Sequence, residues 1–573
     1  MLFVSWFIFA GYCRWVFNGL ERQLRQKDVD EGYLTAQYHR LIVRFSVLAI
    51  FLFALAIYLC NLKYWLQMVP GFEKFAVLQG TLALSLFFFY LSTIWYCAYS
   101  VYKTMFGATI TRRSFIRSNL KFNIPILFPW MVLAAIYDLI ALSPWSGPGG
   151  TLNTVGGQII FFTCFLALLM IFLPGIIQYW WGCKPLGLSD KAMELKAFLR
   201  NSGFKYRGLL NWPIFEGRMM TAGIMGIVPR YRYILITDSL LEILSIDELK
   251  AVIAHEIGHA KYRHLLYYVL FFIGFMMLSF GLSDLFFYLL YNQPFLMEMI
   301  SSQDSQAINL FYLIFSIPML ISIFIYFRYV MGFFMRNFER QADLYSAETI
   351  GTPEYTIRSL EKIAYLGGKS RDLPSWHHFS VRQRVECLNK ALSDPGLLKR
   401  HNRFMAVSFF IYLICMCGLG YFLNFSTTKQ QMAYSMIEKA LNQKLENEPD
   451  NITIYKNLAM VYFQMDRYLD SINTYENIIA LDPDQAECLN NLAWIFVTVP
   501  RKELRDERRG LDLAKKAVSL KKSPVFLDTL AEAYYVNGFI PEAKKAIKEA
   551  ITLSIENRDY YKKQLTKYST SGN

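Results

Sequence analysis

Two histidines and a glutamate near the middle of the chain have the residue types and the spacing of a metal site. His255 and Glu256 are followed by His259, within a helical pattern over residues 247–264 that runs into an apolar segment at residue 265. On a helix, positions i and i+4 share a face, so the two imidazoles stand about 6 Å apart and suit one zinc ion. Glu256 can reach a water bound to that ion and accept its proton. The spacing therefore predicts hydrolysis by a metal-activated water.

A catalytic zinc site needs a third protein ligand, and the topology favours Glu339. The apolar segments 265–291 and 308–331 predict a membrane hairpin whose two ends return to the same face. His259 lies six residues before the first segment and Glu339 eight residues after the second, so at 1.5 Å per residue both lie about 10 Å from the membrane. Asp343, one turn beyond Glu339, is placed to accept the free N–H of a ligating imidazole.

The remaining histidines and the cysteines give no further site. His264 follows His259 by five residues, which predicts a different helix face and no role as a ligand. His39 and His401 carry no signal. The nine cysteines form no CxxC pair, so neither a thiolate zinc site nor a disulfide framework is predicted.

The composition requires a membrane for part of the chain. Of its 573 residues, 54% are hydrophobic and only 18% are charged, which is too apolar for an ordinary soluble protein. The opening run Leu2–Cys13 is apolar but short and ends at Arg14, so it is a first span, an interfacial helix or an uncleaved signal-like segment. Seven longer segments predict transmembrane helices: 43–62, 77–101, 123–143, 157–181, 265–291, 308–331 and 404–424.

The basic residues indicate the orientation of these spans. The net charge of +14 is concentrated in alternate loops, which the positive-inside rule explains better than nucleic-acid binding. The loops 144–156 and 292–307 contain no Lys or Arg and are predicted to face outwards. The Arg- and Lys-rich segments 182–264 and 332–403, which carry the candidate metal ligands, are then cytoplasmic.

The last predicted span decides the location of the C-terminal part. If residues 404–424 cross the membrane, everything after about residue 425 is extracytoplasmic. If they form a surface or re-entrant helix instead, the C-terminal part stays in the cytoplasm.

The C-terminal part contains an internal repeat. Leu458-Ala459 recurs 34 residues later as Leu492-Ala493, and again as Leu530-Ala531 after four additional residues near Pro500. Over about 425–560 the pattern resembles tetratricopeptide (TPR) repeats, which implies a helical solenoid with a protein-binding surface. The alternative is a set of unrelated amphipathic helices that align by chance.

Four motifs in the middle of the chain resemble one protease family. They are Thr221-Ala222-Gly223-Ile224-Met225-Gly226, Tyr233-Ile234-Leu235-Ile236-Thr237-Asp238-Ser239-Leu240-Leu241, His255-Glu256-Ile257-Gly258-His259 and Glu339-Arg340-Gln341-Ala342-Asp343. In order and spacing, over about 185–395, they resemble the gluzincin membrane endopeptidases that include HtpX and the CAAX prenyl proteases. The resemblance implies His255, His259 and Glu339 as zinc ligands, Glu256 as general base and Asp343 as a supporting residue.

The same resemblance implies further site residues. His378 and Arg384 correspond to residues that steady the substrate or the developing oxyanion, although the adjacent His377 leaves the choice of histidine open and Phe379 stands where proline is usual. The resemblance also implies an edge strand that pairs with substrate and includes Thr221, Ala222 and Gly226. Thr221 replaces the usual Asn, which leaves backbone pairing possible but removes that side chain.

The sequence therefore predicts a mostly α-helical polytopic membrane protein with a zinc-peptidase domain, a small edge β-sheet and a TPR solenoid. The expected function is a one-zinc endopeptidase of the cell (inner) membrane that acts on membrane or membrane-proximal proteins in quality control, with protein partners on the repeats. The alternative is a membrane-anchored TPR scaffold with a structural or inactive metal site. The predicted domains are an N-terminal membrane region at 1–181, a peptidase domain at 182–403, a last transmembrane helix at 404–424 and the repeats at 425–573.

Overall fold

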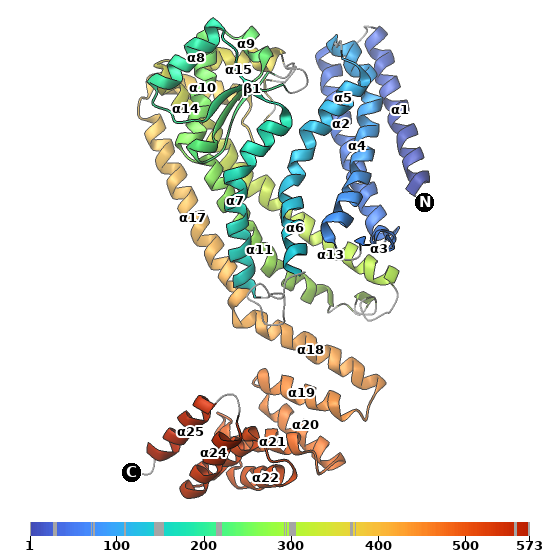
Figure 1. Ribbon diagram of the computed structural model, residues 1–573, viewed down its shortest axis with the longest axis vertical. Helices are drawn as coiled ribbons and strands as arrows, with labels where there is room; N and C mark the ends of the chain where they lie inside the picture. The colour runs from blue at the N-terminus through green and yellow to red at the C-terminus, as the bar shows by residue number, and fades with distance from the viewer. Residues whose placement is uncertain are drawn as a thin grey trace. The chain divides into compact units, whose positions relative to one another are not determined.

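The computed structural model of this chain divides into two compact units, Met1–Asn424 and Phe425–Asn573. Both are built almost entirely of helices (Figure 1). The residues described are 2–26, 31–69, 71–72, 75–107, 110–141, 154–213, 220–291, 293, 295–296, 299, 305–366, 371–372, 374–554 and 558–570. Two predictions fall partly outside these residues. They concern most of the loops 144–156 and 292–307, which lack basic residues, and the end of the predicted span 123–143.

The first unit begins with a group of N-terminal helices, most of which pack against α4. These are α1 Leu2–Gln26, α2 Glu31–Tyr58, α3 Leu62–Gln67, α4 Ala76–Phe106, α5 Arg112–Asn123, η2 Ile124–Leu127, α6 Phe128–Ala141 and α7 Val155–Trp181. On α1, Phe9, Cys13, Phe17 and Leu20 recur at helical spacing and are buried, so one face of the helix packs into the bundle. The helix that contains the apolar opening run does not end at Arg14, because α1 continues to Gln26.

Seven helical segments in the described part of the chain are long and apolar enough to cross a membrane. They are Tyr33–Tyr58, Ala76–Phe106, Arg112–Ile140, Gly156–Trp181, His264–Tyr291, Gln306–Ile350 and Leu397–Asn447. Each overlaps one of the segments expected from the sequence. The first expected segment, 43–62, extends too far, because α2 ends at Tyr58 and Asn61 has a φ of 49° that interrupts the helix.

A four-stranded sheet lies next to the helices that carry the candidate ligands. Its strands are β1 Lys184–Pro185, β2 Gly208–Asn211, β3 Ala222–Met225 and β4 Tyr233–Ile236, in the order β1-β2-β4-β3. Strands β2 and β4 are parallel, whereas β3 pairs antiparallel with β4 and forms an edge. Helix α8 (Asp190–Asn201) supplies Leu195 and Leu199 to the apolar core under this sheet.

The helix of the histidine motif does not run into the membrane as one piece, and this expectation is wrong. Helix α10 (Ile246–Lys261) ends before Tyr262, and α11 (His264–Tyr291) begins only after Arg263. Arg263 has a φ of 57°, in the left-handed region that no continuous α-helix allows. The chain therefore changes direction between the histidine motif and the apolar helix.

The second half of the hairpin carries the other candidate ligand. Helix α13 (Ser305–Ile325) continues through a π-helical turn, η7 (Tyr326–Met331), into α14 (Gly332–Ile350). Helices α15 (Glu354–Leu366) and α16 (Val381–Ser393) follow, and α17 (Leu397–Phe425) returns along α11. An aromatic core joins these helices, in which the Tyr326 hydroxyl lies 2.7 Å from the Phe271 carbonyl and 2.8 Å from the Tyr412 hydroxyl.

The second unit is a series of helices, each packed against the next. They are α18 Thr427–Asn447, α19 Ile452–Gln464, α20 Tyr468–Leu481, α21 Ala486–Thr498, α22 Glu507–Leu520, α23 Pro524–Val536, α24 Ile540–Leu553 and α25 Arg558–Thr570. The alanines of the repeated Leu-Ala pairs, Ala459, Ala493 and Ala531, are fully buried at equivalent positions in the first helix of successive helix pairs. The additional residues near Pro500 lie between α21 and α22, where Lys502–Leu504 form one turn of 3₁₀-helix, η8.

Candidate metal centre

Helix α10 is positioned by its N-terminus. The Ser245 side chain accepts a hydrogen bond from the Glu248 backbone N–H, and the Glu248 carboxylate accepts one from the Ser245 N–H at 2.8 Å. Lys362 of α15 lies 2.9 Å from the same carboxylate. Because this cap fixes where α10 begins, the helix presents the histidine motif in its last two turns.

Small residues allow α10 and α14 to approach closely. A Cβ at Gly258 would lie 3.1 Å from the Ala342 Cα, tighter than ordinary van der Waals contact. One turn further along α14, the Ser346 hydroxyl donates a 2.7 Å hydrogen bond to the Ala251 carbonyl of α10. The close crossing brings Glu339 of α14 opposite the two histidines of α10.

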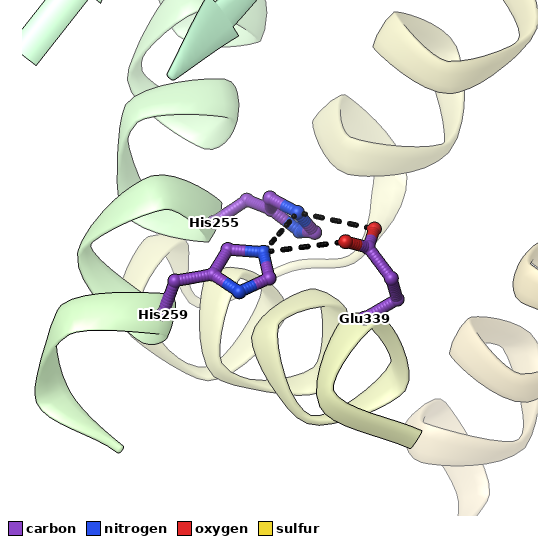
Figure 2. Close-up of side chains that lie close together, drawn as sticks. All are labelled: His255, His259 and Glu339. Atoms are coloured by element: carbon purple, nitrogen blue, oxygen red, sulfur yellow. Dashed lines mark hydrogen bonds and ion pairs between the residues drawn. The ribbon is translucent and has the colours of Figure 1, made fainter. Parts of the chain in front are cut away.

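Three side chains converge from these two helices. Figure 2 shows the rings of His255 and His259 and the carboxylate of Glu339 pointing toward one another. His255 Nε2 lies 3.1 Å from His259 Nε2 and 3.6 Å from Glu339 Oε2, and His259 Nε2 lies 3.5 Å from Glu339 Oε1. Donor atoms about 2.1 Å from a tetrahedral zinc ion stand about 3.4 Å apart. The spacing of the three groups therefore fits one zinc ion with a fourth position open.

The charge state of His259 also fits a ligand role. Burial lowers the pKa of His259 to about 3, which keeps its imidazole neutral and able to donate a lone pair. Burial disfavours the charged form of His255 as well, but the neighbouring carboxylates of Asp343 and Glu339 outweigh this effect and raise its pKa. Asp343 and Glu339 thus place negative charge beside His255, and this charge would also attract a bound cation.

Glu256 lies between the histidines and the edge of the sheet. Its Oε2 accepts a 3.1 Å hydrogen bond from the backbone N–H of Ile224 in β3. This N–H consequently points away from β4, toward the side of β3 that pairs with no other strand among the described residues. Burial raises the pKa of Glu256, which makes its carboxylate a better proton acceptor than an exposed glutamate.

Asp343 stands behind His255, as its position one turn beyond Glu339 predicts. Its Oδ1 lies 2.9 Å from His255 Nδ1, on the side of the ring away from the ligand nitrogen. Arg384 of α16 donates to both Asp343 oxygens, from Nε and from Nη2, at 2.7 Å each. Arg384 thus binds a buried carboxylate with two of its nitrogens. This geometry favours a role in holding Asp343 over a direct contact with substrate.

The structure distinguishes the two adjacent histidines of the loop before α16. His378 Nδ1 lies 3.1 Å from Glu339 Oε2, whereas His377 packs against the ring of His378 with centroids 4.1 Å apart. His378 remains 40% exposed, so it lies at the mouth of the site. Of the pair, His378 is the one placed beside a candidate ligand.

The edge-strand residues are held by the neighbouring strand. Thr221, just before β3, exchanges hydrogen bonds with Thr237, whose hydroxyl donates to the Thr221 carbonyl at 3.1 Å. Ala222 is the first residue of β3. Gly226 follows the strand with a φ of 102°, and a Cβ there would lie 2.2 Å from the Tyr231 carbonyl oxygen. Only glycine fits that position.

His264, for which the sequence predicts a different helix face and no role as a ligand, contacts the candidate ligand His259. Its Nδ1 lies 2.8 Å from His259 Nδ1, and its Nε2 lies 2.8 Å from Gln341 Oε1. The Gln341 amide in turn donates to Asn402 of α17 at 2.7 Å. A five-residue separation places two residues on different faces only if the helix is unbroken. The left-handed conformation of Arg263 breaks the helix, and the sequence does not indicate this break.

No curated protein matches this chain. Among solved structures, the crystal structure of S. mikatae Ste24p is similar to it with a TM-score of 0.43 and 17% identity, over 68% of this chain and 97% of that one. The segment that carries the metal centre, residues 192–411, matches the family model described as Peptidase family M48.

Proposed function

We propose that this chain is an integral membrane zinc endopeptidase of Peptidase family M48, which cleaves peptide bonds of membrane or membrane-proximal proteins. The observation that carries the proposal is the group of His255, His259 and Glu339, whose ligand atoms lie within 4.8 Å of one another. A peptidase also needs a general base and a surface that binds the substrate backbone. The neighbouring carboxylate of Glu256 and the edge strand β3 fit these two roles.

Each residue has a distinct task in this proposal. His255, His259 and Glu339 would hold the zinc ion, which would supply a Lewis acid for a carbonyl oxygen and for the attacking water. Glu256 accepts the proton of the attacking water and later returns it to the leaving amine. Asp343 orients the His255 ring and strengthens it as a donor.

The substrate is proposed to bind as an added strand. Because β3 is an edge strand, its backbone groups that face away from β4 can pair with an extended peptide, which would take over the Ile224 N–H from the Glu256 carboxylate. The Ile224 N–H lies at Glu256, so a peptide paired there places its backbone beside the general base. His378, at the mouth of the site, is proposed to steady the substrate or the oxyanion.

The C-terminal unit is proposed to be a TPR solenoid that binds a protein partner. Successive helix pairs with buried alanines at equivalent positions support this assignment. We further propose a multi-pass location in the cell (inner) membrane, with the metal centre cytoplasmic and the repeats extracytoplasmic. A protease-accessibility test on a tag after Asn573 addresses the location of the repeats. Cleavage of the tag only from the cytoplasmic side would exclude an extracytoplasmic location.

The function is tested on the full chain purified in detergent. The preparation is stripped with a chelator, and casein cleavage is measured before and after one equivalent of zinc is restored. The proposal predicts that cleavage disappears and returns with zinc. A protein that binds zinc but cleaves neither casein nor a panel of membrane-protein substrates would instead fit the alternative, a membrane-anchored TPR scaffold with a structural metal.

A further inference from the structure

A cavity of about 610 Å³ lies beside α14, on a different face of that helix from Glu339. Its walls come from α14, from the loop before α16 and from the first turns of α17. None of the proposed zinc ligands lines it. The cavity is therefore separate from the metal centre, although both share α14.

Three guanidinium groups line this cavity. Arg400 forms an ion pair with Asp394, but in the described part of the chain neither Arg336 nor Arg340 has a carboxylate within ion-pairing distance. Arg336 donates to the Trp376 carbonyl at 2.7 Å, a contact that leaves its charge uncompensated. The cavity thus carries an excess of positive charge and presents N–H donors that suit an oxyanion.

The polarity of the cavity walls follows the direction of the proposed membrane. On α14 the apolar Phe333 comes first after the apolar hairpin helix, and Arg336 and Arg340 come later. On α17 the order is reversed, because Arg400 precedes Phe404, where the next apolar segment begins. At 1.5 Å per residue, the charges on both helices lie about 5 Å or more farther from the membrane than the phenylalanines.

We propose that this cavity binds a phosphate group, carried either by the head group of an anionic phospholipid or by free phosphate. Guanidinium groups bind phosphate oxygens through paired N–H donors, and three of them line this cavity, of which Arg336 and Arg340 have no carboxylate partner among the described residues. The phenylalanines on the membrane side fit the glycerol and upper acyl region of a lipid, which free phosphate does not need. Basic pockets between membrane helices at the cytoplasmic face are typical sites for such head groups.

The cavity is connected to the loop that carries His378. Arg336 holds the Trp376 carbonyl of that loop, and the Arg340 guanidinium lies 4.2 Å from the centre of the Phe379 ring. A phosphate bound by these two arginines therefore contacts the groups that fix the loop.

The test measures ligand binding by the full chain in a neutral detergent, with no assay of peptidase activity. Dioctanoyl phosphatidylglycerol, dioctanoylglycerol and inorganic phosphate are titrated against the wild type, against Arg336→Gln/Arg400→Gln and against Arg403→Gln. Arg403 is the matched control, since it is exposed on α17 and does not line the cavity. The double variant is expected to bind the phosphate-bearing ligand at least about tenfold more weakly, and the control to bind as the wild type does.

The ligand series separates the two sources of phosphate. Tight binding of phosphatidylglycerol with weak binding of inorganic phosphate and of dioctanoylglycerol assigns the site to a lipid, and equal binding of inorganic phosphate assigns it to the free ion. A charge-conserving variant, Arg336→Lys/Arg400→Lys, is expected to have intermediate affinity because it keeps the charge but loses the paired donors. Unchanged affinity in a Gln double variant that melts cooperatively, or no binding of either phosphate ligand by the wild type, would overturn the proposal.

Discussion

His264 Nδ1 lies 2.8 Å from Nδ1 of His259, although the two residues are five positions apart. The left-handed conformation of Arg263 ends α10 and turns the start of α11 back toward the metal centre. Through Gln341 and Asn402, this contact continues to α17. A helix that enters the membrane is thereby linked to the orientation of a proposed zinc ligand.

Replacing His264 with Phe is expected to weaken zinc binding about 10- to 100-fold, because His259 loses the group that orients its ring. Phenylalanine keeps the stacking on Phe338, whose ring centre lies 4.1 Å away, so the change removes mainly the nitrogens. Competition with a chromophoric chelator measures the affinity. His39→Phe, an exposed histidine on α2, is the control; equal zinc affinity of His264→Phe and wild type would show that the contact does not position the ligand.

Much of this centre could be predicted from the sequence because its chemistry depends on short spacings. The pair His255 and His259 needs only one regular helix, and Glu339 needs only a hairpin with two ends at similar depth. His264 was misplaced because no residue type signals a left-handed turn at an arginine. The sheet edge at Ile224 and the bidentate contact of Arg384 depend on tertiary packing, which spacing alone does not report.

Replacing Gly258 with Val is expected to destabilise the first unit by about 1–3 kcal/mol, because the new side chain meets the backbone of α14 at Ala342. The two helices must separate, so zinc affinity should fall together with stability. Thermal unfolding in detergent and zinc content measure the two effects. Gly418→Val is the matched control, since a Cβ at that helical glycine has no neighbour within 4 Å. Equal losses in the two variants would contradict a role for close helix packing.

Replacing Arg384 with Met is expected to cost about 3–5 kcal/mol of stability, because Asp343 is then a buried carboxylate without its cation. Adding Asp343→Asn to this variant should recover part of the loss, since the uncompensated charge disappears. Thermal or denaturant unfolding of the single and double variants measures the coupling. The neighbouring Arg382, whose ion pair with Asp372 is exposed, is the control, and its change to Met should cost less than about 1 kcal/mol. A strictly additive double variant would show that the pair is not coupled.

The second unit should lose stability as the pH rises from about 4 to about 6. Burial raises the pKa of Asp528 in α23 to about 6, although the Tyr560 hydroxyl donates to it at 3.1 Å. The unfolded state releases this proton at lower pH than the folded state, so stability is greatest below the unfolded pKa and falls up to the folded one. The change is at most about 3 kcal/mol and is complete above that range.

Hydrogen exchange of α23 to α25 in the full chain, corrected for the intrinsic pH dependence of exchange, measures this effect. Asp528→Asn should remove the pH dependence and increase protection at pH 7. Asp512→Asn, at an exposed position of α22, should change neither. Protection in the wild type that is constant, or that increases, between pH 4 and 6 would contradict the assignment.

The central claim is that Glu256 is the general base beside a zinc ion held by His255, His259 and Glu339. The most direct measurement compares wild type and Glu256→Gln in the same detergent, with zinc content and casein cleavage determined on each preparation. We expect about one zinc per chain in both proteins and a loss of cleavage of at least about 100-fold in the variant. Full cleavage by Glu256→Gln, or a wild type that cleaves without bound metal, would contradict the central claim.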